Sequence, residues 1–208
     1  MPTFRPTLLR LSGGTALLAL LAACAPALAL PGPLPPEGAR HARDGLRGSE
    51  LLDVAAASVA LQRDDYAMAC ALLARAHEKS PTNLMILFNL AGAYEGLGLD
   101  EAHAAQRDAH LALAERQYER LLSLAPQMGS AAFKLARIAQ HRADPPKAAR
   151  WYGKALALDP ANPVYHFNMA GVQEELGKPQ AAERHYRQAI ALKPDLLYAY
   201  NNLALLLE

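Results

Sequence analysis

Between residues 50 and 208 the apolar positions recur three or four residues apart, the spacing of an α-helix and not the alternation of a strand. In AARWYGKALALDP (148–160) the pattern is Ala-x3-Tyr-x2-Ala-x4-Pro, and AAERHYRQAIALKP (181–194) repeats it in full. Alanines let helix backbones approach closely while tyrosines fill the wider gaps. The pattern therefore predicts helices that pack on one another through the same positions in each copy.

Two earlier copies of this pattern fix the period of the repeat. Ala148 corresponds to Ala182 in the two copies above, an interval of 34 in the numbering. The same interval before residues 148–160 gives Ala114, Tyr118, Leu121 and Pro126, and a further 45 gives Ala69, Leu73, Ala76 and Pro81. Pairs of small or apolar residues precede each copy at the same intervals: Ala56-Ala57, Leu90-Ala91, Leu135-Ala136, Met169-Ala170 and Leu203-Ala204. Each unit thus has room for two helices and a turn, and stacking of units creates the core.

A 34-residue helix–turn–helix unit with these positions resembles the tetratricopeptide repeat. The resemblance covers residues 50–208 and implies an all-α fold, a tetratricopeptide-repeat α-solenoid that winds as a right-handed superhelix. We expect these segments: a signal peptide at 1–23, a Pro/Gly-rich tether at 24–48, a degenerate repeat at 50–83, a repeat with an 11-residue insertion at 84–128, repeats at 129–162 and 163–196, and a C-terminal capping helix or half repeat at 197–208.

Departures from the repeat pattern lead to further expectations. Leu97-Gly98 and Leu176-Gly177 are expected to end first helices, with each glycine in the left-handed conformation. Pro160 and Pro194 are expected to stop second helices. Asp53 stands where the family has tryptophan, which indicates a terminal cap with a polar outer face. The 11 extra residues of the second unit predict a second helix that overhangs its neighbours by about 16 Å.

Residues 1–48 show the pattern of a targeting segment followed by a linker. The apolar run from Leu11 to Ala25 is shorter than the roughly 20 residues that span hydrocarbon, and Arg5 and Arg10 precede it, as in secretory signals. Leu21-Ala22-Ala23-Cys24 resembles the lipobox of bacterial lipoproteins, which implies lipidation of Cys24. An ordinary cleavage site at Ala27-Leu28-Ala29 is the alternative. The Pro/Gly-rich residues that follow predict an extended tether.

Composition excludes several classes of protein. Without residues 1–23, which hold Arg5 and Arg10 and no acids, 19 of the 21 basic residues face 20 acidic ones, so the mature chain shows no electrostatic footprint for nucleic acid. The cysteines are Cys24 and Cys70, and Cys24 is either acylated or removed. A structural disulfide is therefore excluded, and Cys70 is expected to pack as a small buried apolar residue.

Candidate catalytic and metal-binding patterns do not hold together. DEAH (100–103) spells a helicase motif, but the chain has no phosphate-binding G-x4-G-K-[ST] loop. His103, Arg107 and His110 share a helical face at a spacing too wide for a helical zinc site. His166 takes a packing position in its repeat, and no nucleophile motif is present. We expect no enzyme, no cofactor and no metal site.

The expected binding surface is a groove lined by the first helix of each repeat, as in the family. Its candidate residues are Phe88, Asn89, Phe133, Lys134, Arg137, Phe167, Asn168 and Asn202. The resemblance implies that the asparagines hydrogen-bond the backbone of an extended peptide, and Lys134 with Arg137 suits a carboxylate. The alternative is that the phenylalanines pack between helices and the asparagines only reflect the family consensus. The two-carboxylate clamp of chaperone-tail binders is not expected, because Val54 and Ser58 occupy its first-repeat positions.

Together these features predict a membrane-tethered scaffold that binds protein or peptide partners and helps to assemble a cell-envelope complex. The resemblance to bacterial lipoproteins implies, from Ala25 rather than Asp after the cysteine, an outer-membrane lipoprotein that faces the periplasm. The alternatives are a soluble periplasmic adaptor after ordinary signal cleavage, and the amino-terminal part of a larger enzyme. Leu203, Leu206 and Leu207 of the last helix are expected to be exposed unless that helix acts as a cap, and self-association through it is a further candidate.

Overall fold

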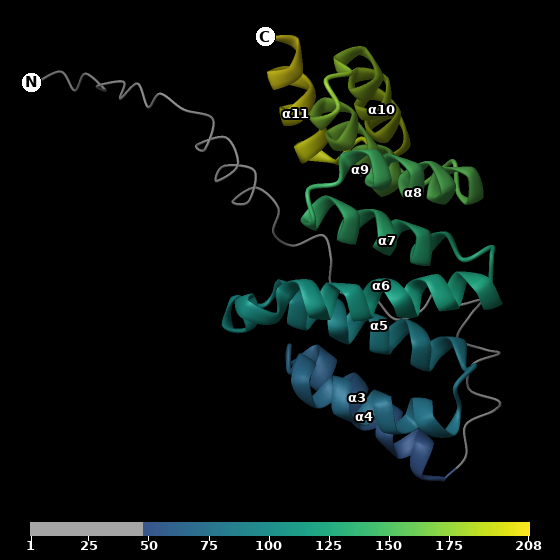
Figure 1. Ribbon diagram of the computed structural model, residues 1–208. Helices are drawn as coiled ribbons and strands as arrows, with labels where there is room; N and C mark the ends of the chain where they lie inside the picture. The colour runs from purple at the N-terminus through teal and green to yellow at the C-terminus, as the bar shows by residue number, and fades with distance from the viewer. Residues whose placement is uncertain (1–47) are drawn as a thin grey trace, which may run out of the picture. The chain divides into compact units, whose positions relative to one another are not determined.

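The computed structural model describes residues 48–208, apart from the side chain of Glu101, and these residues form helices and no strands. The helices are α3 (Ser49–Gln62), α4 (Tyr66–Lys79), α5 (Leu84–Leu99), the 3₁₀ helix η1 (Glu101–Gln106), α6 (Arg107–Leu124), α7 (Gly129–His141), α8 (Pro145–Leu158), α9 (Pro163–Glu175), α10 (Pro179–Leu192) and α11 (Leu197–Leu207). Figure 1 shows that they follow one another as hairpins in chain order. The predicted all-α fold is confirmed.

Each hairpin packs on the next through the helices that are neighbours in sequence. α3 pairs with α4, α5 with α6, α7 with α8 and α9 with α10, and the second helix of each pair contacts the first helix of the following pair. Side-chain oxygens of Asp65, Asn83, Asp144 and Asn162 accept hydrogen bonds from the first turns of α4, α5, α8 and α9. These caps satisfy amide groups that have no partner inside a helix, so these four residues specify where α4, α5, α8 and α9 start.

The repeated alanines and tyrosines form the contacts that the sequence predicts. Ala114, Ala148 and Ala182 are completely buried on α6, α8 and α10. One turn further on, Tyr118, Tyr152 and Tyr186 are buried as well. Positions i and i+4 of a helix lie on the same side, so the alanine and the tyrosine form one buried inner face on each of these three second helices.

Of the predicted helix ends, three are confirmed and one is wrong. α8 ends at Leu158 and α10 at Leu192, each shortly before its proline, and Gly177 has a φ of 68° after α9. Gly98, in contrast, lies inside α5, where it is buried. A Cβ at Gly98 would come within 2.8 Å of Leu111 on α6, so this glycine allows the close approach of two helices and is not a cap.

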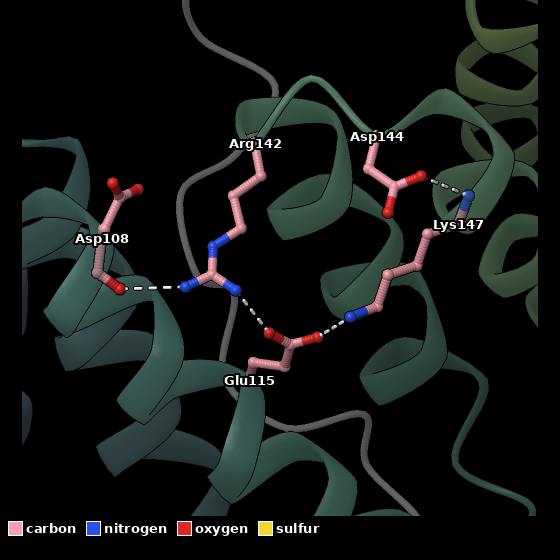
Figure 2. Close-up of polar contacts among 5 residues, drawn as sticks. All are labelled: Asp108, Glu115, Arg142, Asp144 and Lys147. Carbon is pink, nitrogen blue, oxygen red and sulfur yellow. Dashed lines mark hydrogen bonds and ion pairs between the residues drawn. The ribbon is translucent and has the colours of Figure 1, made fainter.

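The 11-residue insertion does not form one lengthened helix. The prediction that all 11 residues extend the second helix of this repeat is therefore wrong. Compared with the α7–α8 hairpin, α5 has three more residues, the connection to α6 has four more, and α6 has four more. The connection contains η1, whose His103 has non-helical backbone angles. Arg142 holds the added first turn of α6, because its Nη2 donates to the Asp108 carbonyl oxygen at 2.9 Å (Figure 2).

Asp53 is not on a polar outer face, contrary to the expectation from its position in the repeat. Its side chain is 8% exposed, and Arg75 of α4 pairs with both carboxylate oxygens. A buried carboxylate is tolerated only with such a partner. The cation on the neighbouring helix is what permits an acid at the position where tryptophan is usual.

Two smaller expectations concern Cys70 and the last helix. Cys70 is a free, buried thiol, and burial raises its pKa to about 12, so it packs as a small apolar residue as predicted.

On α11, Leu203 and Leu206 are partly buried against the cluster around Tyr186, whereas Leu207 is exposed. The last helix therefore covers part of the preceding repeat and keeps an apolar outer side.

Candidate functional site

The predicted site residues lie on the first helices of successive repeats. We use the name first-helix face for the predicted residues other than Phe88, together with the buried Glu95. Its members are Asn89 and Glu95 on α5, Phe133, Lys134 and Arg137 on α7, Phe167 and Asn168 on α9, and Asn202 on α11. Phe88 of α5 belongs to the predicted set but not to this surface, since only 6% of it is exposed and its ring packs edge-on against Tyr118 at 5.7 Å.

The other two phenylalanines are half-buried and lean on tyrosines of neighbouring helices. The ring centroid of Phe133 lies 5.6 Å from that of Tyr152, and the Phe133 ring stacks on Tyr165 at 5.0 Å. Phe167 lies 5.8 Å from Tyr186. Aromatic contacts at these distances stabilise packing between helices. The interpretation of these rings as packing groups thus has direct structural support, and each ring is only partly exposed to a partner.

Two of the three asparagines already use their amide donors within the protein. Asn168 Nδ2 donates to the Val164 carbonyl oxygen at 2.7 Å, and Asn202 Nδ2 donates to the Tyr186 hydroxyl at 3.2 Å. Asn89 is half-buried on α5. An asparagine that keeps one donor and its carbonyl oxygen can still bond a peptide backbone, so this role stays a prediction.

The sequence reading missed Glu95, which lies beneath the two cations that it singled out. Glu95 is 3% exposed; its Oε2 accepts from Lys134 Nζ at 2.9 Å and from the Tyr118 hydroxyl at 3.2 Å. Its Oε1 lies 3.4 Å from Arg137 Nη1 as an ion pair, yet neither of these two buried atoms has a hydrogen bond. Lys134 and Arg137 therefore share one carboxylate, and the cluster carries one excess positive charge.

The hydrogen bond from Tyr118 to Glu95 has equivalents in the later repeats, each from the buried tyrosine of a second helix to a polar side chain of the first helix. The Tyr118 hydroxyl donates to Glu95, the Tyr152 hydroxyl to Gln140 at 2.6 Å, and the Tyr186 hydroxyl to Glu174. The acceptors Glu95, Gln140 and Glu174 follow one another at the same intervals as the first-helix pairs Leu90-Ala91, Leu135-Ala136 and Met169-Ala170. An alignment of the polar positions of the repeats, and not only of the apolar ones, would have revealed these three equivalent acceptors.

The electrostatics of the cluster follow from burial. Removal of water, together with the neighbouring Glu95 carboxylate, raises the pKa of Tyr118 far above its ordinary value, so the hydroxyl stays protonated and donates. His141 keeps an exposed surface, but loss of water around its ring, and then the positive charge of Arg137, lower its pKa. His141 follows Lys134 and Arg137 along one side of α7 and is neutral near pH 7. The excess charge is thus carried by the lysine and the arginine.

Arg137 gives the first-helix face its main unsatisfied hydrogen-bonding capacity. A buried donor without an acceptor costs free energy comparable to a lost hydrogen bond. An oxygen from a partner, as a carboxylate or a backbone carbonyl, would accept from Arg137 Nη1 and offset the excess charge. The arrangement can hold an oxygen-bearing group.

Histidines elsewhere pair without forming a three-ligand site. The rings of His103 and His110 lie 6.1 Å apart, and His103 also contacts Asp100 at 3.1 Å. His166 is half-buried, as expected, with its Nδ1 3.0 Å from Nδ1 of His185 and its Nε2 3.0 Å from the Pro160 carbonyl oxygen. No group of three metal-ligating side chains occurs within residues 48–208 as described.

Two further points concern the membrane prediction. The predicted lipidation site Cys24 lies outside the described residues. Within the described part of the chain, none of the helices combines the length and the apolar character that crossing a bilayer requires.

The described helices form a solenoid of helix–turn–helix repeats, and comparison with known proteins assigns its type. The tetratricopeptide repeat family model matches residues 166–197. No curated relative matches this chain in sequence. The fold is that of a tetratricopeptide-repeat protein, as predicted.

Solved structures of such proteins share this fold at low sequence identity. The crystal structure of MamA protein aligns with a TM-score of 0.65 at 17% identity, covering 76% of this chain and 80% of that one. The thermophilic tetratricopeptide protein TTC0263 from Thermus thermophilus gives 0.63 at 18%, covering 82% and 87%. MamA from Desulfovibrio magneticus RS-1, residue 41 to the end, gives 0.68 at 14%, covering 78% and 85%.

Proposed function

We propose that this protein is a non-enzymatic scaffold that binds a segment of a partner protein on its first-helix face. Stacked helical repeats form extended surfaces that suit this task. The partner segment lies across α5, α7, α9 and α11, where Asn89 and Asn168 bond its backbone. The edges of Phe133 and Phe167 contact its apolar side chains. Envelope assembly is the process that this scaffold serves, in keeping with the amino-terminal targeting pattern.

The observation that carries the proposal is the excess charge of the Glu95 cluster. Two cations share one carboxylate here, as Arg142 and Lys147 share Glu115, but both of those cations donate to Glu115 whereas Arg137 Nη1 keeps no hydrogen bond. Lys134 is 12% exposed and Arg137 18% exposed, so both approach a bound chain while remaining largely desolvated. Charge-assisted hydrogen bonds from such groups are roughly twice as strong as neutral ones.

The test removes the charges without leaving a buried ion. In the variant Glu95→Gln, Lys134→Met, Arg137→Met, the glutamine still accepts from Tyr118, as Gln140 accepts from Tyr152 in the next repeat. We expect recovery of the partner by crosslinking in cells to fall by about tenfold or more, because one charge-assisted hydrogen bond contributes about 1.5–3 kcal/mol.

A matched control removes the same charges elsewhere. Glu78→Gln, Arg63→Met and Lys193→Met alter exposed residues that form no ion pair with described residues. This control is expected to recover the partner as the unaltered chain does. Equal recovery with the Glu95 variant would refute the binding role of the cluster.

We also propose that the scaffold is tethered to a bacterial envelope membrane by diacylglycerol on Cys24, with residues 24–48 as the spacer. Two acyl chains anchor a protein stably where a single one does not. The mass of the mature amino-terminal peptide, measured from the membrane fraction, is expected to be that of a chain starting at diacylated Cys24. A chain that starts at unmodified Leu30 would show ordinary signal cleavage and exclude the anchor.

A further inference from the structure

The outer sides of the second helices carry arginines in register. Arg116 on α6, Arg150 on α8 and Arg184 on α10 occupy equivalent positions of successive repeats, and all are exposed. Each stands midway between the buried alanine and the buried tyrosine of its helix. At about 100° per residue, that middle position points directly away from an inner face formed by positions i and i+4.

Two more cations extend this arrangement into a surface. Arg120 and Lys154 follow Arg116 and Arg150 by one helical turn and are also exposed. We use the name second-helix face for this set: Arg116, Arg120, Arg150, Lys154 and Arg184. None of the five makes an ion pair with another residue of the described chain.

Some acidic residues near this face form ion pairs with cations that do not belong to the set of five. Glu115 accepts from Arg142 Nη1 at 2.7 Å and from Lys147 near the start of α8 (Figure 2). Glu183 pairs with Arg187 at 2.8 Å. Asp108 and Glu119 are the remaining exposed acids on α6 that these ion pairs do not involve. Although the mature chain is almost neutral, its charges are therefore segregated, with a surplus of cations on the second-helix face.

The tryptophan of the chain borders the same surface. Trp151 is the single tryptophan in the sequence; it is half-buried, and Lys154 Nζ lies 5.3 Å from its ring centroid. Lys147, Arg150, Trp151 and Lys154 line a shallow hollow of about 390 Å³ on α8. Tryptophan beside lysine and arginine is the combination that prefers the headgroup layer of a bilayer.

We propose that the second-helix face binds the anionic phospholipid surface of a membrane. The cations occupy two positions on each of two helices and a third helix continues the series, so they form a two-dimensional array and not a single line. A membrane presents many anionic headgroups, so several of these cations contact it together. Clusters of four to eight basic residues attract anionic lipids by about 1 kcal/mol for each residue near the surface. This inference concerns a different face from the proposed partner site and stands independently of it.

The experiment measures partitioning of the full chain onto vesicles of phosphatidylcholine alone and of an equimolar mixture with phosphatidylglycerol. The apolar amino-terminal run contributes to both, so the difference between the two vesicle types reports on charge. We expect tighter binding to the anionic vesicles, with a shift of Trp151 fluorescence to shorter wavelength. The variant Arg116→Gln, Arg150→Gln, Arg184→Gln is expected to lose about 100-fold of the partition coefficient on those vesicles.

The matched control changes three exposed cations away from this face, Arg63, Lys178 and Lys193, to glutamine. It is expected to keep most of the anionic preference, and added salt is expected to weaken binding of the unaltered chain. Equal partitioning of the unaltered chain onto both vesicle types would overturn the proposal. So would an equal loss in both variants, or binding to polyglutamate in preference to anionic vesicles at matched charge concentration.

Discussion

Replacement of Lys134 and Arg137 by methionine, with Glu95 retained, is expected to lower the free energy of unfolding by about 3 kcal/mol. Breaking a buried ion pair leaves an uncompensated charge, which costs about 3–5 kcal/mol. The lower end applies because the Tyr118 hydroxyl still donates to Glu95 at 3.2 Å. Urea denaturation followed by circular dichroism measures the change.

The addition of Glu95→Gln to this double variant is expected to restore most of the lost stability. The amide accepts the hydrogen bond from Tyr118 and carries no charge to bury, as Gln140 does beside Tyr152. If the double variant were as stable as the unaltered chain, Glu95 would not depend on the two cations. The cluster would then be ordinary surface charge, worth about 0–1 kcal/mol.

The substitution Tyr152→Ala is expected to destabilise the protein by about 3–5 kcal/mol, the usual cost of removing a large buried aromatic ring. Tyr152 is completely buried, contacts the Phe133 ring, and donates its hydroxyl to Gln140. Because repeats interact mainly with their neighbours, hydrogen exchange is expected to accelerate most in α7, α8 and α9 and least in α3.

Two control variants separate packing from the hydrogen bond. Tyr152→Phe keeps the ring and is expected to cost about 1 kcal/mol, the net contribution of one hydrogen bond. Tyr198→Ala removes an exposed tyrosine of α11 and is expected to change stability by about 0.5 kcal/mol or less. A Tyr152→Ala variant as stable as Tyr198→Ala would contradict the assignment of the repeated tyrosine to the core.

The fold could be predicted from the sequence because the residues that repeat at a fixed period, alanine and tyrosine, have a steric role in helix packing. Alanine and tyrosine at fixed spacing admit one packing arrangement, and the buried positions of α6, α8 and α10 match it. Gly98 shows the limit of such patterns. The same Leu-Gly pair ends α9 at Gly177 but lies inside α5, because the four added residues of the connection let that helix run on.

The site was predicted less completely, because its decisive contacts are specific to pairs of repeats. Lys134 and Arg137 were identified from their charge, but Glu95 belongs to the preceding repeat and only packing brings it to Lys134. Asp53 was misread for a related reason, since its partner Arg75 lies on the other helix of the same repeat and only packing brings the two together. Burial of an acid is invisible in a single-sequence pattern until a nearby cation is located in space.

The central claim is that the first-helix face binds a partner chain, and photo-crosslinking in cells tests it most directly. A crosslinking amino acid at Asn201 of α11, which is exposed and in register with Phe133 and Phe167, is compared with one at Ala157, exposed on α8. The account predicts a defined protein adduct at Asn201, lost in the variant Glu95→Gln, Lys134→Met, Arg137→Met, and none of the same mass at Ala157. The same adduct from Ala157 alone, or one that persists undiminished in the triple variant, would contradict it.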